Sequence, residues 1–168
     1  MHPSTAYPST AKERRFVLRL YEYWQTLRAE RDMPSLAQWD FDAMGEDANH
    51  CLVLAIDPAD QSATLARLGS ELSSATWTGE PGTPVSAFPD DEAVAQIRIH
   101  LPEPLERKIP ISRGGYFQAA GRRVLGRCIL LPLSDDGVAV THVVAGVNYK
   151  DAPKAPSAKA YQKKLAWS

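Results

Sequence analysis

The first clear pattern in the chain is an amphipathic helix that begins at Thr10 and ends near Arg31. Thr10 and Glu13 have the spacing of a capping box, in which each side chain satisfies a backbone N–H at the start of a helix. Apolar side chains then recur along one helical stripe, at Phe16, Val17, Leu20, Trp24 and Leu27. Met33 precedes Pro34, which pushes it out of the α region and predicts the end of the helix there.

A β-hairpin is predicted after a short connecting segment. Ser35 is placed to cap a brief helical segment through Trp39, and the acidic connection at 40–47 has room for another turn. The apolar run at 51–56 is closed by an Asp-Pro pair, which indicates a buried strand followed by a turn. Residues 62–69 predict the return strand of this hairpin.

The middle of the chain is the least regular part. Pro81, Pro84 and Pro89 interrupt residues 71–104, and only 91–99 is patterned well enough to predict a helix, so we expect short helices and loops here. Strand patterns return between 108 and 149, separated by Arg113-Gly114-Gly115, by 120–122 and by 134–137. The last of these contains Asp-Asp-Gly and predicts a hairpin, because glycine supplies the positive φ that tight turns need.

The order of elements predicts the fold class. A leading amphipathic helix, two strands, short helices and three further strands indicate an α+β fold with a five-stranded antiparallel sheet. The length of 168 residues suits one domain. We expect residues 1–9 to be a flexible leader, 10–150 to be the domain and 151–168 to be a flexible basic tail.

Composition narrows the classes of partner. The net charge of −1 argues against a nucleic-acid binder that works by bulk phosphate neutralisation. The first ten residues have no basic segment followed by an apolar one, and no apolar run approaches the length of a membrane span. A cytoplasmic protein without a membrane span is therefore expected.

Six basic residues lie near the predicted strand ends, in a stretch of sequence that has no acidic residue between the first and the last of them. One interpretation is an anion site, if the strand ends converge; the commoner situation is a solvated charged face. These residues are Arg107, Lys108, Arg113, Arg122, Arg123 and Arg127. The acidic stretch Asp40, Asp42, Glu46 and Asp47 either complements them across a protein contact or is plain surface.

Residues 121–128 mimic the spacing of a phosphate-binding P-loop. Arg and Cys stand at the diagnostic positions, however, and a strand follows rather than a helix, so we reject that motif.

Cysteines and histidines give no metal site. Cys51 and Cys128 lie in separate apolar stretches, which predicts buried free thiols rather than a disulfide. His142 with Cys128 is the best pair for a metal, but two ligands do not make a zinc site, and a register slip of one residue would separate them. His50 and His100 have weaker claims, and one isolated histidine carries little specificity for haem. No cofactor is assigned.

Catalytic motifs are also missing from the sequence. There is no G-x-S-x-G elbow, and the spacing of Ser112, Asp135 and His142 does not predict that they converge. We therefore expect a protein that is not an enzyme.

Three segments resemble a known family. These are the helix segment LYEYWQTLRAERDMPS, the strand segment TLARLGSEL, and ILLPLSDDG followed by VVAGVNY. Across roughly residues 16–149 the chain resembles the small PAS-like proteins common in alphaproteobacteria. The resemblance implies a sensor or interaction module, in which a curved sheet and the middle helices enclose a small pocket. It also implies that the leading helix often mediates dimers.

The expected ligand-binding residues are apolar side chains that face inward from strands and middle helices. They are Leu54, Leu68, Trp77, Phe88, Ile97, Tyr116, Leu130 and Val144. Plain core packing is the alternative for each of them.

The sequence thus predicts a sensory or regulatory module that binds a small ligand or a protein partner and signals through protein contacts. A homodimer through the helix Thr10 to Arg31 is expected, because Phe16, Tyr21 and Trp24 give that helix more aromatic surface than a short sheet covers. Two alternatives remain. One is a small curved-sheet enzyme of the isomerase or hydrolase type, with a histidine and a carboxylate in one pocket; the other is a structural interaction module without a ligand.

Overall fold

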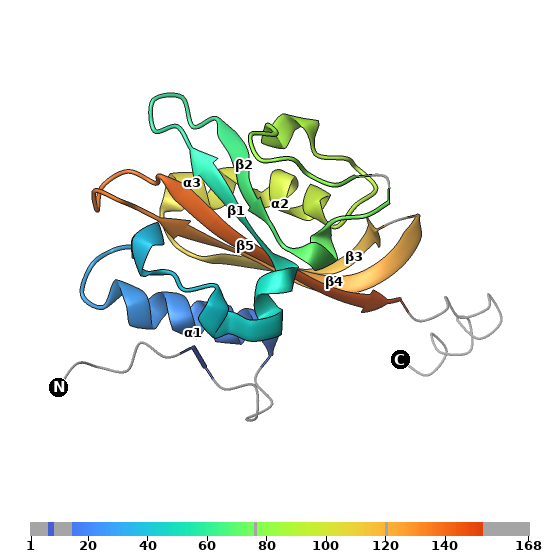
Figure 1. Ribbon diagram of the computed structural model, residues 1–168, viewed down its shortest axis with the longest axis horizontal. Helices are drawn as coiled ribbons and strands as arrows, with labels where there is room; N and C mark the ends of the chain where they lie inside the picture. Colours follow the sequence, from blue (N-terminus) through green and yellow to red (C-terminus); the bar gives the residue numbers. More distant parts are fainter. Residues whose placement is uncertain (1–6, 9–14, 76, 120, 153–168) are drawn as a thin grey trace, which may run out of the picture.

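The centre of the molecule is an antiparallel sheet of five strands, in the order β2-β1-β5-β4-β3 (Figure 1). The computed structural model describes residues 7–8, 15–75, 77–119 and 121–152. The strands are β1 (Cys51–Ile56), β2 (Ala63–Leu68), β3 (Ile111–Ala119), β4 (Arg122–Leu133) and β5 (His142–Asp151). The helices are α1 (Phe16–Arg28), α2 (Val94–His100) and α3 (Pro102–Arg107). The predicted α+β class is confirmed, with a leading helix and short helices between the second and third strands.

Two helical layers cover opposite faces of this sheet. Helix α1 packs on β4 and β5, and Figure 1 shows it on one side while α2 and α3 lie on the other. Gly146 on β5 marks the α1 side, because a Cβ there would lie 2.7 Å from Leu20 and 2.8 Å from Phe16. Successive side chains of a strand point to opposite faces of the sheet. Together with the pairing register, the position of Gly146 therefore shows which residues of the paired strands lie on the α1 face.

Helix α1 is anchored by the apolar stripe that the sequence shows. Phe16, Leu20, Trp24 and Leu27 are all buried, and the Trp24 indole N–H donates to the carbonyl of Pro132, 2.8 Å away. Arg15 holds the N-cap position, and the predicted capping residues Thr10 and Glu13 lie outside the described residues.

The helix ends at Arg28 rather than near Arg31, which corrects the predicted boundary. Ala29 has a φ of 52°, and the Gln38 side-chain amide donates to the carbonyl of Leu27 at 3.1 Å. The helix is therefore stopped by contacts with the next segment, well before Pro34.

That next segment contains two 3₁₀ helices, at Leu36–Gln38 and Asp42–His50. The first has a capping box between Ser35 and Gln38, as the position of Ser35 predicted. The segment leads directly into β1, so the α1 layer is covalently continuous with the sheet.

The hairpin predicted at 51–56 and 62–69 is confirmed as β1 and β2. The turn between β4 and β5 is also confirmed, with Gly137 at a φ of 83° and the Ser134 hydroxyl accepting from its N–H. Tertiary pairing then places β5 between β1 and β4, at the centre of the sheet.

Two details between residues 91 and 119 differ from the prediction. The helical region continues beyond 91–99 as α3, which has a proline in its first turn. Strand β3 runs without interruption through Arg113-Gly114-Gly115, which was expected to separate strand segments. The ladder to β4 supplies the reason, because Gly115 pairs directly with Gly126 and adopts a φ of 147° that favours glycine.

Among the described residues, no helix combines the length and the apolar character needed to cross a bilayer.

Candidate functional site

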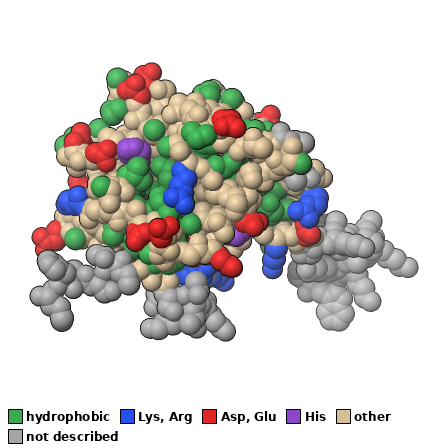
Figure 2. Space-filling view, in the orientation of Figure 1, with side chains coloured by type: hydrophobic (Ala, Val, Ile, Leu, Met, Phe, Trp, Pro, Cys, Tyr) green, Lys and Arg blue, Asp and Glu red, His purple; other side chains and the backbone are tan. Residues whose placement is uncertain are grey.

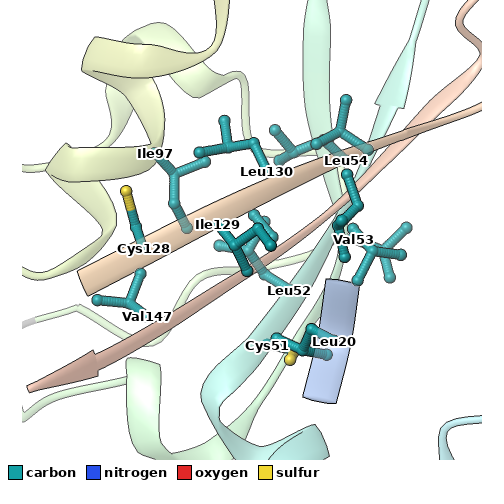
Figure 3. Close-up of a cluster of buried hydrophobic side chains, with 14 of the residues drawn as sticks. Leu20, Cys51, Leu52, Val53, Leu54, Ile97, Cys128, Ile129, Leu130 and Val147 are labelled. Carbon is teal, nitrogen blue, oxygen red and sulfur yellow. The ribbon is translucent and has the colours of Figure 1, made fainter. Parts of the chain in front are cut away.

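The face of the sheet under α2 and α3 is filled with packed side chains. Leu54, Ile97 and Leu130, three of the predicted ligand-binding residues, have no exposed surface, and Phe88 is 2% exposed. Figure 3 shows Ile97, Leu130 and Leu54 in one cluster of buried side chains. The alternative of core packing describes these four residues.

Two further predicted residues lie at the margin of this core. Leu68 and Trp77 are partly buried, and the Trp77 ring meets Phe88 edge to face with centroids 5.3 Å apart. They pack against the core rather than line any of the pockets described below.

Tyr116 and Val144 lie on the α1 face of the sheet, opposite the face under α2 and α3. Val144 is two residues from Gly146 and shares its face, and it is fully buried. Tyr116 pairs with Leu125; the residue is 55% exposed, and the guanidinium of Arg123 lies over its ring. The predicted set therefore divides between two faces and does not enclose a common cavity.

Three pockets of more than 400 Å³ lie around α1 instead. We name the first the sheet-end groove: it has a volume of about 420 Å³ and lies between the start of α1, the middle of β3, the first half of β4 and the C-terminal end of β5. Its lining residues are Arg15, Phe16, Val17, Gly115, Leu125, Gly126, Arg127, Asn148, Tyr149 and Lys150.

A second pocket, the helix-side groove, has a volume of about 730 Å³ and follows the other half of α1. Three separate segments of the chain form it, namely α1 with the residues after it, the end of α3 and the β4–β5 turn. Its lining residues are Tyr21, Trp24, Gln25, Arg28, Asp32, Met33, Arg107, Lys108, Ile109, Pro110, Gly137 and Val138.

A third pocket of about 600 Å³ surrounds a buried charge cluster. The Arg19 guanidinium donates to both carboxylate oxygens of Asp47, at 2.7 and 2.9 Å, and the Tyr7 hydroxyl donates to Asp47 at 2.6 Å. Burial opposes ionisation of Asp47, but the hydrogen bonds from Arg19 and Tyr7 outweigh it and hold its pKa below the usual value. Burial and the neighbouring carboxylate raise the pKa of Tyr7. The cluster thus joins the N-terminal segment to α1 and to the segment before β1.

The basic residues singled out in the sequence do not form one anion site. Arg107 and Arg113 both bond Glu103, and Arg122 bonds Asp151. The Lys108 ammonium donates to the carbonyl of Val138, and Arg123 stacks over Tyr116. Figure 2 shows charges of both signs interspersed with apolar side chains over the face in view. Of the six, only Arg127 lines the sheet-end groove.

The histidine and cysteine candidates are separated by the sheet register. Cys128 pairs with Val147 and His142 with Leu133, so the two lie five residues apart along the hairpin and on opposite faces. Both cysteines are buried free thiols, as predicted. Among the described residues, no group of three or more His, Cys, Asp or Glu side chains is placed to hold a metal ion.

The histidines give only weak support to the alternative of an enzyme. His142 Nδ1 is 3.7 Å from a carboxylate oxygen of Asp135, but neither residue lines any of the four pockets described. His100 lines a recess of about 40 Å³ beside Arg113, with no carboxylate among the lining residues. Burial and the charge of Arg113 lower the pKa of His100.

Comparison with known proteins does not identify a family for this chain. No family model matches the sequence, and no curated protein matches it. The chain is similar to a solved structure described as an RNA-binding light-oxygen-voltage receptor, with a TM-score of 0.43 and 15% sequence identity. The match covers 69% of this chain and 34% of the receptor chain, so it spans about a third of that receptor's length. At this level of similarity no binding property is transferred.

The sequence did not single out most of the residues that line the two grooves beside α1. Arg15, Asn148 and Lys150 are ordinary polar positions near the ends of elements. The sheet register brings Asn148 and Lys150 near Arg127, and the packing of α1 on the sheet brings Arg15 to the same groove. The alternation along β5 was a usable signal, since Asn148 and Lys150 follow a buried run on alternate positions.

Proposed function

We propose that the protein is a PAS-like regulatory module without catalytic activity, which responds to a small ligand or a protein partner and signals through protein–protein contacts. The five-stranded antiparallel sheet, the leading helix and the helical connection between β2 and β3 support the family resemblance seen in the sequence. The cytoplasmic location and the alphaproteobacterial kinship remain predictions from the sequence.

The observation that carries this proposal is the helix-side groove. Tyr21, Ile109 and Val138 come from three segments, line the same groove and are 38%, 40% and 70% exposed. Leu18, one turn before Tyr21 on α1, is also exposed. Apolar side chains gathered on one surface are typical of a site for protein contact.

We assign this surface to a homodimer formed through α1. The helix exposes Leu18 and Tyr21 at a spacing of three residues, which places them on one side of the helix, away from the buried stripe. A second copy of α1 packed on this surface would cover them together with the apolar rim of the groove. The expected dimer helix of the sequence, Thr10 to Arg31, is described here only for its part from Arg15 onward.

Light scattering coupled to size-exclusion chromatography tests the assignment. We expect a dimer for the native chain and a monomer for Tyr21→Glu, because the new charge would be desolvated in the interface. Ile99→Glu is the matched control, since Ile99 on α2 is 56% exposed and lies on the other helical layer. A native chain that is monomeric at about 100 µM, where a 1 µM dissociation constant would give mostly dimer, would overturn the homodimer.

A further inference from the structure

The sheet-end groove combines an apolar floor with an unbalanced positive charge. Phe16 and Val17 of α1 and Leu125 of β4 contribute apolar side chains to its lining. Phe16 is buried, whereas Val17 and Leu125 are half-buried. The volume of about 420 Å³ lies within the range of small-molecule pockets, toward its lower end.

Three cations surround this floor. Arg15 precedes the first turn of α1, Arg127 lies on β4 and Lys150 lies on β5, and all three are exposed. Arg127 pairs across the strands with Asn148, while Lys150 pairs with Leu125, so Arg127, Asn148 and Lys150 share one face of the sheet. The amide of Asn148 adds a further possible donor to the same rim.

No acid balances these charges in the part of the chain that the structure describes. The lining contains no Asp or Glu, and no ion pair joins Arg15, Arg127 or Lys150 to a carboxylate of the described residues. The neighbouring Arg113 and Arg122 differ in this respect, because Glu103 and Asp151 neutralise them. The groove is therefore a place on this end of the sheet where an anion meets positive charge that no described carboxylate compensates.

The Arg127 side chain lies close to the neighbouring strand β3. Its guanidinium lies so close to Gly114 that a Cβ at that position would be 3.1 Å from it. A glycine at 114 thus leaves room for the guanidinium to lie over β3. A planar guanidinium presents paired N–H donors, which match the two oxygens of a carboxylate.

We propose that the sheet-end groove binds a small carboxylate with an apolar body, of the size of a medium-chain fatty acid. The carboxylate would bond Arg127 and Lys150, and the apolar body would lie on Phe16, Val17 and Leu125. This proposal names a ligand class for the proposed regulatory function. Binding of the ligand does not depend on that function; only the biological consequence of binding does. Because the groove includes the first turn of α1, the same ligand would contact the helix that we assign to the dimer.

Isothermal titration calorimetry of the full chain with decanoate tests the proposal. We expect a dissociation constant below about 1 mM, with at least tenfold weaker binding for Arg127→Gln. Arg122→Gln is the matched control, because Arg122 lies on the same strand, is paired with Asp151 and does not line the groove. Circular dichroism melts of both variants verify that they are folded.

Two ligand controls separate the contributions of charge and of apolar contact. Decanol keeps the chain without the charge, and butanoate keeps the charge with a short chain; we expect both to bind at least tenfold more weakly. Equal binding of decanol and decanoate, or equal binding by the native chain and Arg127→Gln, would overturn the proposal. The proposal would also be overturned, in favour of binding to a membrane surface, if the protein co-sedimented with anionic phosphatidylglycerol vesicles and added decanoate did not reduce this co-sedimentation.

The failure of this proposal is distinguishable from that of the dimer. Titration of Tyr21→Glu with decanoate measures the groove in a chain whose dimer surface is altered, since Tyr21 lines the other groove. Binding retained in this variant supports the ligand site whatever the oligomeric state of the protein is. If Tyr21→Glu keeps its fold but no longer binds decanoate, the sheet-end groove of a single chain is not sufficient for binding, which would contradict the proposal.

Discussion

Arg19 on α1 and Asp47 in the segment before β1 form a two-point ion pair, with Nε 2.7 Å from one carboxylate oxygen and Nη2 2.9 Å from the other. Both side chains are largely buried, at 13% and 10% exposure. The hydroxyl of Tyr7 donates to the same carboxylate, and its ring meets Tyr23 edge to face. This pair ties the helical layer on one face of the sheet to the chain that enters β1.

Replacing Asp47 by Asn is therefore expected to destabilise the fold. Removing one partner of a buried pair leaves the other charge uncompensated, which costs about 3 kcal/mol. Urea denaturation at pH 7 measures the change in the free energy of unfolding. The exposed Asp42→Asn is the control and should stay within about 0.5 kcal/mol of the native chain. Equal stability of both variants would show that the pair contributes nothing net.

The same carboxylate gives a prediction about pH. Arg19 and Tyr7 hold the pKa of Asp47 in the folded state below its usual value of 3.8. The stabilising contribution is therefore present in full above the unfolded-state pKa and is lost as pH falls through the lower folded-state pKa. Urea midpoints at pH 7, 5 and 3 should fall less steeply for Asp47→Asn than for the native chain. An identical slope would assign the acid sensitivity to other carboxyl groups.

Gly146→Ala is expected to displace α1 from the sheet. The new methyl would lie 2.7 Å from Leu20 and 2.8 Å from Phe16, so the helix must shift at a cost of about 1–3 kcal/mol. Thermal and urea unfolding measure this loss. In a Leu20→Ala background the same substitution should cost less, because part of the obstructing side chain is gone. Additive losses in the double variant would contradict the close contact.

The two cysteines should be unreactive in the folded protein. Burial raises the pKa of the Cys128 thiol to about 11 and raises that of Cys51 as well, so neither forms the reactive thiolate at pH 8. Ellman's reagent should detect no thiol in the native chain and two in guanidinium chloride. Rapid reaction of either thiol without denaturant would show that its strand opens or that its environment is more exposed than described.

The sequence by itself determined the features that depend on neighbouring residues. The stripe of Phe16, Leu20, Trp24 and Leu27 predicted the buried side of α1, and the Asp-Pro and Asp-Asp-Gly turns predicted both hairpins. Each of these signals lies within a few residues of the element that it specifies, so local physical chemistry is sufficient. The number of strands and the α+β class followed from the order of these elements.

Only the tertiary structure decided which residues meet. Val144 and Tyr116 turned out to face α1, because a period of two makes the face of each residue depend on a register fixed by distant partners. Arg19 and Asp47 are 28 residues apart, and Arg15 and Lys150 reach one groove from opposite ends of the described chain. Long-range packing of α1 on β4 and β5 brings these groups together, and no spacing in the sequence encodes such contacts.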